Sequence, residues 1–293
     1  MKRYIGDILL LITAIVWGSG FVMTAIALEH LTAYEVMAGR FLLGTLIITV
    51  LFYKKLRLIS KSVLWKGAVL GTILFVAFAL QTVGLEYTTP SKNAFLTAVN
   101  VVIVPVIAYL VYRRRIDRHE LIASVIALTG IAFLSLQGSF TINIGDLLTL
   151  LCAVGFAFDI FYTNMFVKKE DALALTIVQF ATAALLSTVA VLFQGGFPAS
   201  PSNEAIWSVV YLAVFSTTIA YVCQNLAFRY TTPTKAAVIL SLESFFGSVL
   251  AVLFINDVMT GRMVFGAALI LVAVLVAEIK PAFRMKRGVQ TEH

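Results

Sequence analysis

The sequence predicts an all-α integral membrane protein whose ten transmembrane helices form an inverted repeat of two five-helix units. Three observations lead to this fold class. The composition is too apolar for a water-soluble globule. The chain divides into ten apolar segments whose connections alternate between many basic residues and few. A sequence repeat also pairs the first five segments with the last five.

The composition excludes most soluble protein classes. Of the 293 residues, 60% are apolar and 13% are charged, whereas soluble domains carry about 25% charged residues. Ten spans of about 20 residues each leave no room for a separate extramembrane domain. The two cysteines, Cys152 and Cys223, lie inside apolar runs without metal-ligand spacing. We therefore expect packing roles for them, no metal site and no disulfide.

Each of the ten apolar segments is long enough to be a candidate span. They cover residues 5–28, 34–53, 66–85, 93–112, 120–136, 145–166, 173–193, 207–228, 236–254 and 263–279. The first segment follows two basic residues and could instead be a cleaved signal peptide, but its length exceeds the apolar region of such peptides. We expect it to be retained as a span.

The placement of basic residues predicts the orientation. With the amino terminus inside, 19 of the 22 lysines and arginines fall in inner connections or tails. Only Lys92 and Arg262 fall outside, and Arg40 lies within a span. Positive residues are retained on the cytoplasmic side during insertion, so both termini are expected in the cytoplasm. The same placement explains the net charge of +7 without a nucleic-acid partner.

An internal repeat divides the chain into residues 1–138 and 139–293. Residues 81–92 (QTVGLEYTTPSK) align with residues 224–235 (QNLAFRYTTPTK), with six identities among twelve positions. Gly6-Asp7 likewise matches Gly145-Asp146. Because five spans are an odd number, the second copy must cross the membrane with the opposite polarity. Inverted repeats are a known basis for alternating access to a site at mid-membrane.

The repeated YTTP motif has the residues of a helix start. Thr89 and Thr232 are suitable N-caps, and Pro90 and Pro233 suit the first helical position. We expect a structural role for both turns. Asp7 and Asp146 are expected to cap helix starts, where the helix dipole favours a carboxylate.

Two carboxyl residues near the centres of their spans, Asp159 and Glu243, are candidates for proton coupling. Ionised groups at this depth are costly and therefore functional candidates by default. Burial disfavours the charged form of a carboxyl, which allows it to exchange a proton during transport. The alternative is that such polar groups hold helices together by hydrogen bonds.

Polar and aromatic residues at helical spacing predict a central site. The stripes are 93-97-100, 155-159-162 and 217-221-224, and the first span carries aromatic residues and two glycines within WGSGF. Close helix packing is the alternative for these glycines. An aromatic wall of Trp17, Phe21 and Tyr162 would suit a cationic or amphipathic solute. The residues expected to bind substrate are Trp17, Ser19, Phe21, Asn100, Tyr162, Tyr221 and Gln224.

Two further residues within spans have structural interpretations. Arg40 lies in the outer half of its span, where we expect its long side chain to reach the interface or to pair with Glu35. Pro105 would loosen the helix of the fourth segment, either as a hinge or as an accommodated kink.

The chain resembles the EamA family of the drug/metabolite transporter superfamily, and the resemblance covers both halves. The matching strings are residues 17–21 (WGSGF), 40–43 (RFLL), 94–105 (AFLTAVNVVIVP), 241–243 (SLE) and 266–271 (GAALIL). The resemblance implies ten spans with both termini inside and transport of small metabolites, often the export of amino acids or related compounds.

The leading hypothesis is a secondary transporter of a small organic solute in the bacterial cytoplasmic membrane. It needs no cofactor, and the chain contains no P-loop string for an ATP motor. Its partners would be the solute and the lipid bilayer, and a homodimer is left open. A non-transporting membrane helper or channel subunit is one alternative. An intramembrane enzyme is another, but the embedded carboxyls are isolated and we expect no catalytic residues.

Overall fold

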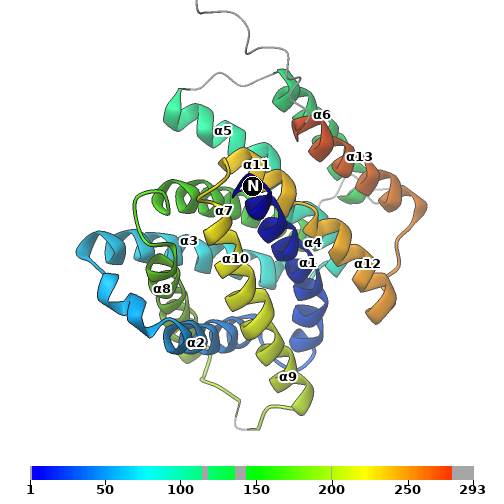
Figure 1. The fold of residues 1–293 in the computed structure, drawn as a ribbon. Helices are drawn as coiled ribbons and strands as arrows, with labels where there is room; N and C mark the ends of the chain where they lie inside the picture. The colour runs from blue at the N-terminus through cyan, green and yellow to red at the C-terminus, as the bar shows by residue number, and fades with distance from the viewer. Residues whose placement is uncertain (1, 114–117, 136–142, 199, 279–293) are drawn as a thin grey trace, which may run out of the picture.

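The structure is a computed structural model that describes residues 2–113, 118–135, 143–198 and 200–278. Every regular element within these ranges is a helix (Figure 1). The elements are α1 (Lys2–Leu28), α2 (Ala33–Leu51), the 3-10 helix η1 (Tyr53–Leu58), α3 (Lys61–Leu85), α4 (Pro90–Thr97), α5 (Asn100–Tyr112), α6 (Arg118–Ser135), α7 (Ile144–Phe166), α8 (Ala172–Phe193), α9 (Asn203–Tyr211), the π-helix η2 (Leu212–Ile219), α10 (Ala220–Ala227), α11 (Pro233–Leu240), α12 (Glu243–Ile255) and α13 (Gly261–Glu278). The prediction of an all-α protein is confirmed for the described part of the chain.

Among the described residues, seven helical stretches are long and apolar enough to cross a membrane. They are Tyr4–Leu28, Ala33–Leu51, Lys61–Leu85, Pro90–Val111, Ile144–Phe166, Ala172–Phe193 and Asn203–Ala227. The ranges Glu243–Ile255 and Gly261–Ala273 are shorter apolar helices. The chain is therefore a multi-pass membrane protein, and the expected number of ten spans stays a prediction. The inner basic residues Arg114 and Arg115 and those in the tail at 280–287 lie outside the described residues.

The structure has the same irregularities at matching places in the two halves. The helix is interrupted at Ala98-Val99, between α4 and α5, and again at Ser241-Leu242, between α11 and α12. Arg113 and Asn256 then end α5 and α12 with positive φ angles of 52° and 53°. Each pair is 143 positions apart, the same offset as the YTTP repeat. Similar sequence is accompanied by similar backbone.

The two YTTP turns begin helices as the sequence predicts. The Thr89 side chain accepts a hydrogen bond from the Lys92 amide, and the Thr232 side chain accepts one from the Lys235 amide. The proline after each threonine occupies the first turn of its helix, where its missing N–H costs nothing. The capping prediction for both turns is confirmed.

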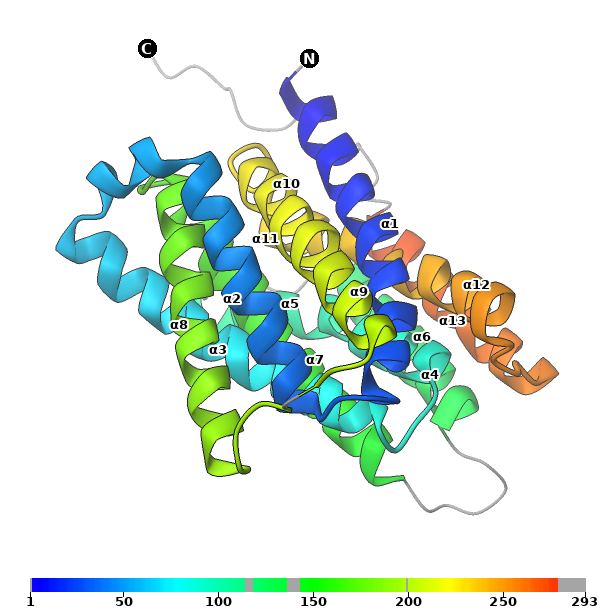
Figure 2. The same ribbon diagram turned by 90° about the horizontal axis from the view of Figure 1, so that it is seen from below.

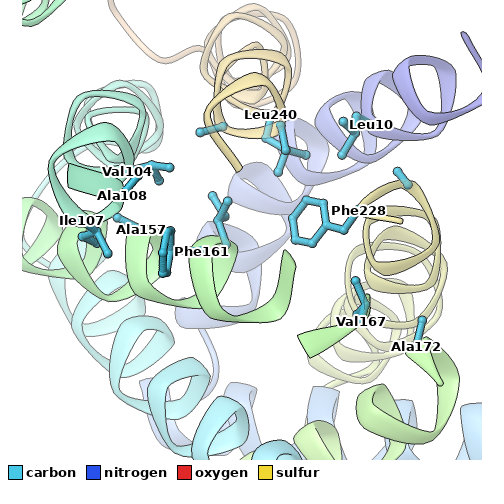
Figure 3. Packing of buried hydrophobic residues seen from close by; sticks show 14 of the residues in the cluster. Leu10, Val104, Ile107, Ala108, Ala157, Phe161, Val167, Ala172, Phe228 and Leu240 are labelled. Atoms are coloured by element: carbon cyan, nitrogen blue, oxygen red, sulfur yellow. The ribbon is translucent and has the colours of Figure 1, made fainter. Parts of the chain in front are cut away.

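Helices from the two halves pack against each other throughout the bundle. α6 lies beside α13 at one edge, α2 beside α8 at another, and α3 packs on α7 (Figures 1 and 2). Near the centre, α1 packs on α10 and α12, and α4 packs on α12. One buried apolar cluster joins Leu10 of α1, Phe161 of α7 and Leu240 of α11 to Phe228 beyond α10 (Figure 3). The core is therefore shared between the halves.

Helix α5 continues through Pro105. The interruption of this segment lies at Ala98-Val99 instead, seven positions earlier. The helix therefore accommodates Pro105 in this conformation, and a hinge at this residue stays a prediction.

A cluster of ion pairs lies at the start of α8. Lys55 Nζ donates to Asp171 Oδ2 at 2.8 Å, Arg229 Nη2 lies 3.8 Å from the same oxygen, and Asp171 Oδ1 caps the helix through the Leu173 and Ala174 amides. Burial raises the pKa of Asp171, but the hydrogen bonds from Lys55 and Ala174 and the two cationic charges outweigh it, so that its pKa is lowered.

We expect Asp171→Asn to lower the melting temperature at pH 7 and to matter less in acid. A carboxyl with a lowered pKa stabilises the fold above its unfolded pKa of about 3.9, and this stabilisation is lost as the pH falls through the folded value. Asparagine still caps the helix, so the difference reports the ion pairs and should not exceed about 1 kcal/mol. Melting curves of purified protein from pH 7 to pH 3.5 measure it. A difference in melting temperature between wild type and variant that increases in acid would contradict this account.

Candidate substrate site

A cavity inside the bundle brings together side chains from both halves. Its walls come from the C-terminal halves of α1 and α3, from α2, α4, α5 and α7, and from η2, α10 and the start of α12. Three charged residues line it: Arg40, Asp159 and Glu243. Aromatic rings form much of the remaining wall, contributed by Trp17, Phe21, Phe78, Phe156 and Tyr221.

The cavity is narrow in this conformation. The cavity volume is about 40 Å³, which is room for a few waters. An organic solute could enter only after the surrounding helices separate. The site therefore has the lining of a binding pocket but the size of a contracted one.

The two carboxyl residues differ in their partners. Asp159 Oδ1 accepts hydrogen bonds from Gln179 Nε2 at 2.8 Å and from Thr163 Oγ1 at 3.5 Å. Glu243, the first residue of α12, lines the cavity, and its carboxyl makes no hydrogen bond to any described residue. Because an unpartnered group can gain or lose a proton without breaking a protein contact, Glu243 is better placed than Asp159 for exchange with the cavity.

Arg40 points into the cavity, so both sequence-based roles for it are wrong. Only 3% of the residue is exposed. Its Nε donates to Thr217 Oγ1 at 2.9 Å, and its Nη2 donates to Ser216 Oγ at 3.1 Å. Glu35 instead completes a capping box with Thr32 at the start of α2. For Arg40, the sequence feature that could have indicated a place in the site was its charge inside an apolar span.

Tyr221 lines the cavity together with the three charged residues. Its hydroxyl is buried and has no hydrogen-bond partner among the described residues. Its ring packs against that of Trp17, with 5.0 Å between centroids. Trp17 Nε1 donates to the Ser216 carbonyl at 2.9 Å, within the π-helical stretch η2. Short π-helical stretches often occur at functional sites. This one carries Ser216, and α10, which follows it directly, carries Tyr221; both residues line the cavity.

Comparison with known sequences identifies the family of this chain. The sequence profile of the EamA-like transporter family matches residues 4–136 and again residues 143–278. The chain belongs to the EamA-like transporter family. The family resemblance predicted from the sequence strings is thus confirmed.

Several relatives of this EamA-like protein are named as transporters. An uncharacterized transporter of Archaeoglobus fulgidus is 32% identical over 96% of this chain and 88% of its own length. The inner membrane transporter YedA of Escherichia coli K12 is 24% identical over 76% of this chain and 74% of its own. A solved crystal structure shares the fold with a TM-score of 0.72, 16% identity and coverage of 93% and 96% of the two chains. The protein is therefore a membrane transporter by family.

The EamA-like cavity contains some of the residues predicted to bind substrate and omits others. Trp17, Phe21, Asn100 and Tyr221 line it. Ser19 does not, because its hydroxyl faces the Val16 carbonyl and the Tyr211 hydroxyl, at 2.7 and 2.6 Å. The substrate-binding roles of all these residues remain proposals.

Tyr162 and Gln224 also lie outside the cavity lining. Tyr162 stacks on Phe158 with 6.1 Å between centroids, which separates it from the expected wall with Trp17 and Phe21. Gln224 is fully buried, and neither of its amide atoms has a partner among the described residues. Its repeat counterpart Gln81 does line the cavity. The repeat alignment was therefore the signal that could have pointed to Gln81.

The two glycines of WGSGF have different neighbours. A Cβ atom on Gly18 would lie 2.7 Å from Phe246 Cβ and 2.8 Å from the Gly247 amide nitrogen. Gly18 therefore permits close packing of α1 on α12. Gly20 lines the cavity, and a Cβ there would lie 2.7 Å from Ser216 Oγ, the hydroxyl that accepts from Arg40. Packing and site formation are thus divided between the two positions.

Each YTTP turn contacts the first helix of the other half. Lys235 Nζ lies 2.6 Å from Asp7 Oδ1, and Lys92 Nζ lies 3.9 Å from Asp146 Oδ2. Thr88 also donates to Asp146 Oδ1 at 2.7 Å. Asp7 lies inside α1 beyond its first turn, so the capping prediction is wrong for it. Asp146 lies in the first turn of α7, where the helix dipole favours a carboxylate as predicted, although the N-cap residue itself is Asn143. Both carboxylates also join the halves at two matching places.

Proposed function

We propose that this EamA-like protein is a secondary transporter that exports small organic solutes, such as amino acids or related amphipathic metabolites, by alternating access. The observation that carries the proposal is the cavity, in which one cation, two carboxyls and several aromatic rings from both halves surround a contracted space. Sites at the interface of two repeats are typical of secondary transporters.

The proposed topology has ten spans, in two inverted units at residues 1–138 and 139–293, with both termini in the cytoplasm. The basic residues on one set of connections support the orientation. The matching helix interruptions and positive-φ residues support the duplication. In this topology, α4 with α5 and α11 with α12 each make one interrupted span, and α6 and α13 supply the remaining two.

The proposed orientation also relates the cavity to one side of the membrane. The lining residues of α1 and α3 lie in the C-terminal halves of these helices. With the amino terminus inside, these halves are the outer ones. The solute would therefore be released to the outside when the outer end of the cavity widens. Exchange of conformations between the two units would open the other end. In each conformation, one of the two ion pairs beside the YTTP turns, Lys92–Asp146 or Lys235–Asp7, would then be formed while the other is weakened.

Transport can be tested with the purified chain alone. Metabolite profiles of cells with and without the protein identify the solutes whose distribution changes, and proteoliposomes loaded with the strongest of them measure flux. We expect flux from vesicles that contain only this chain. Vesicles without protein are the control. Absence of flux for every solute that the profiles identify would favour the helper or channel-subunit alternative.

We expect Glu243→Gln to make transport insensitive to pH. The substitution keeps the shape of the side chain but removes its exchangeable proton, and the carboxyl makes no hydrogen bond to a described residue that would be lost. Flux at pH 6, 7 and 8, with and without a pH gradient, is the measurement. Asp159→Asn is the matched variant and should retain more of the pH dependence, because Gln179 and Thr163 already bind its carboxyl. If Glu243→Gln retains the wild-type pH profile, Glu243 does not couple transport to protons.

A further inference from the structure

Arg40 is a buried cation without an ion-pair partner among the described residues. It lines the cavity with only 3% of its surface exposed. No carboxylate of the described residues lies within 4.0 Å of its guanidinium, and both of its hydrogen bonds go to neutral hydroxyls. Buried cations are costly unless an anion compensates them, and more so within a membrane.

Two carboxyl groups line the same cavity but form no ion pair with this guanidinium within 4.0 Å. Asp159 is bound by Gln179 and Thr163, and Glu243 makes no hydrogen bond. The cation and the carboxyls are therefore present in one site without being paired. A cavity arranged in this way keeps the cation available for a negatively charged group from outside the protein.

The guanidinium is also held in a fixed plane. Thr217 and Ser216 accept from Nε and Nη2, and the Phe78 ring lies 4.4 Å from Cζ. These contacts use two of the five N–H groups of an arginine, which leaves three donors for a ligand. A planar guanidinium with free N–H groups matches the two oxygens of a carboxylate. A phosphate dianion fits less well, since one cation cannot balance it and two carboxyls face the same space.

We propose that Arg40 binds the carboxylate of the transported solute and thereby makes the cavity selective for solutes that carry one. This inference rests on the proposed transport function and adds a specificity-determining residue to it. The aromatic rings around the cavity would contact the apolar part of the same solute. Ser216 and Thr217 act through Arg40, by holding its guanidinium in place.

Binding to purified protein in detergent tests the inference without any need for flux. The probes are L-phenylalanine and 3-phenylpropionate, which have a carboxylate, and L-phenylalaninamide and phenethylamine, which do not. Phenyl phosphate tests the alternative anion. We expect the two carboxylates to bind at least 10-fold more tightly than the amide and the amine. Equal affinity for phenylalanine and its amide, tighter binding of the phosphate, or no binding of any carboxylate would overturn the inference.

Variants of Arg40 separate recognition from folding. Arg40→Gln should weaken carboxylate binding by about 10- to 100-fold, the range expected for hydrogen bonds to a charged group, and leave amide binding unchanged. Arg40→Lys keeps the positive charge but lacks the planar N–H donors of the guanidinium, so it should bind carboxylates more tightly than Arg40→Gln and less tightly than the wild type. Arg229→Gln removes an arginine that does not line the cavity and should bind as the wild type does. If all probes weaken together in Arg40→Lys, Arg40 is structural only.

The same variants distinguish failure of the inference from failure of the proposed function. Carboxylate-selective binding without flux in proteoliposomes would support Arg40 recognition and contradict transport. Flux whose preference for phenylalanine over its amide is unchanged in Arg40→Lys would support transport and contradict the role of Arg40.

Discussion

Asp146→Asn is expected to destabilise the protein by about 3 to 5 kcal/mol, the usual cost of leaving one partner of a buried ion pair alone. The Asp146 side chain is fully buried, and that of Lys92 is 7% exposed. Without the carboxylate, Lys92 would lose the only acidic group within 4.0 Å of its amine among the described residues. Thermal unfolding of the purified protein measures the effect.

The matching pair in the other half provides the control for this prediction. Lys235 and Asp7 have side-chain exposures of 18% and 31%, so water and ions screen their interaction. Asp7→Asn should therefore cost only about 0.2 to 1 kcal/mol. Removing both charges in Lys92→Met with Asp146→Asn should recover much of the stability lost in the single variant. Equal costs for Asp7→Asn and Asp146→Asn would contradict the assignment of one buried and one exposed pair.

Gly18→Leu is expected to cost about 3 kcal/mol or more and to reduce the yield of folded protein sharply. Overpacking a close interface costs about 1 to 3 kcal/mol even where side chains can adjust. Here a Cβ would lie 2.8 Å from the Gly247 nitrogen and 3.0 Å from the Glu243 carbonyl oxygen, and backbone atoms cannot rotate away. α1 and α12 would have to separate, which would also displace Glu243 from the cavity.

Size-exclusion chromatography of detergent extracts and thermal unfolding measure this loss. Gly261→Leu is the matched control, because no heavy atom of the described residues outside its own helical surroundings lies within 4 Å of a Cβ there and its φ is not positive. It should behave as the wild type does. A Gly18→Leu protein with wild-type yield and melting temperature would show that α1 and α12 do not approach as closely as described.

Much of the fold could be predicted because it depends on composition and on local sequence. Apolar content and segment length indicate helices that cross a membrane. The caps at Thr89 and Thr232 involve residues only three positions apart, so the YTTP motif was enough to predict them. The duplication was visible as sequence identity, and the structure repeats its 143-residue offset in the helix interruptions and in Arg113 and Asn256.

The site was predicted less completely. Embedded charge drew attention to Asp159 and Glu243, since such groups are rare enough in spans to stand out. Both line the cavity, and their role in proton coupling stays a prediction. The same reasoning applied to Arg40, but its depth in the span suggested a side chain that reaches the interface. Tyr162 and Gln224 shared helical stripes with cavity residues, yet neither lines the cavity. Tyr162 stacks on Phe158, and Gln224 is buried without a hydrogen-bond partner among the described residues. A stripe identifies residues on one face of a helix but not what that face contacts.

From sequence, then, one could derive a helical membrane protein, its internal sequence repeat and the helix starts at the two YTTP motifs, because these follow from transfer to lipid and from contacts between close neighbours in the chain. Three features became visible only once the helices were packed together. They are the set of residues around the cavity, the different neighbours of Gly18 (α12) and Gly20 (Ser216), and the ion pairs by which Asp7 and Asp146 join the two halves. In a membrane, lipid and protein interior are both apolar, so hydrophobic periodicity hardly distinguishes the faces of a helix. Contacts between distant segments decide those assignments.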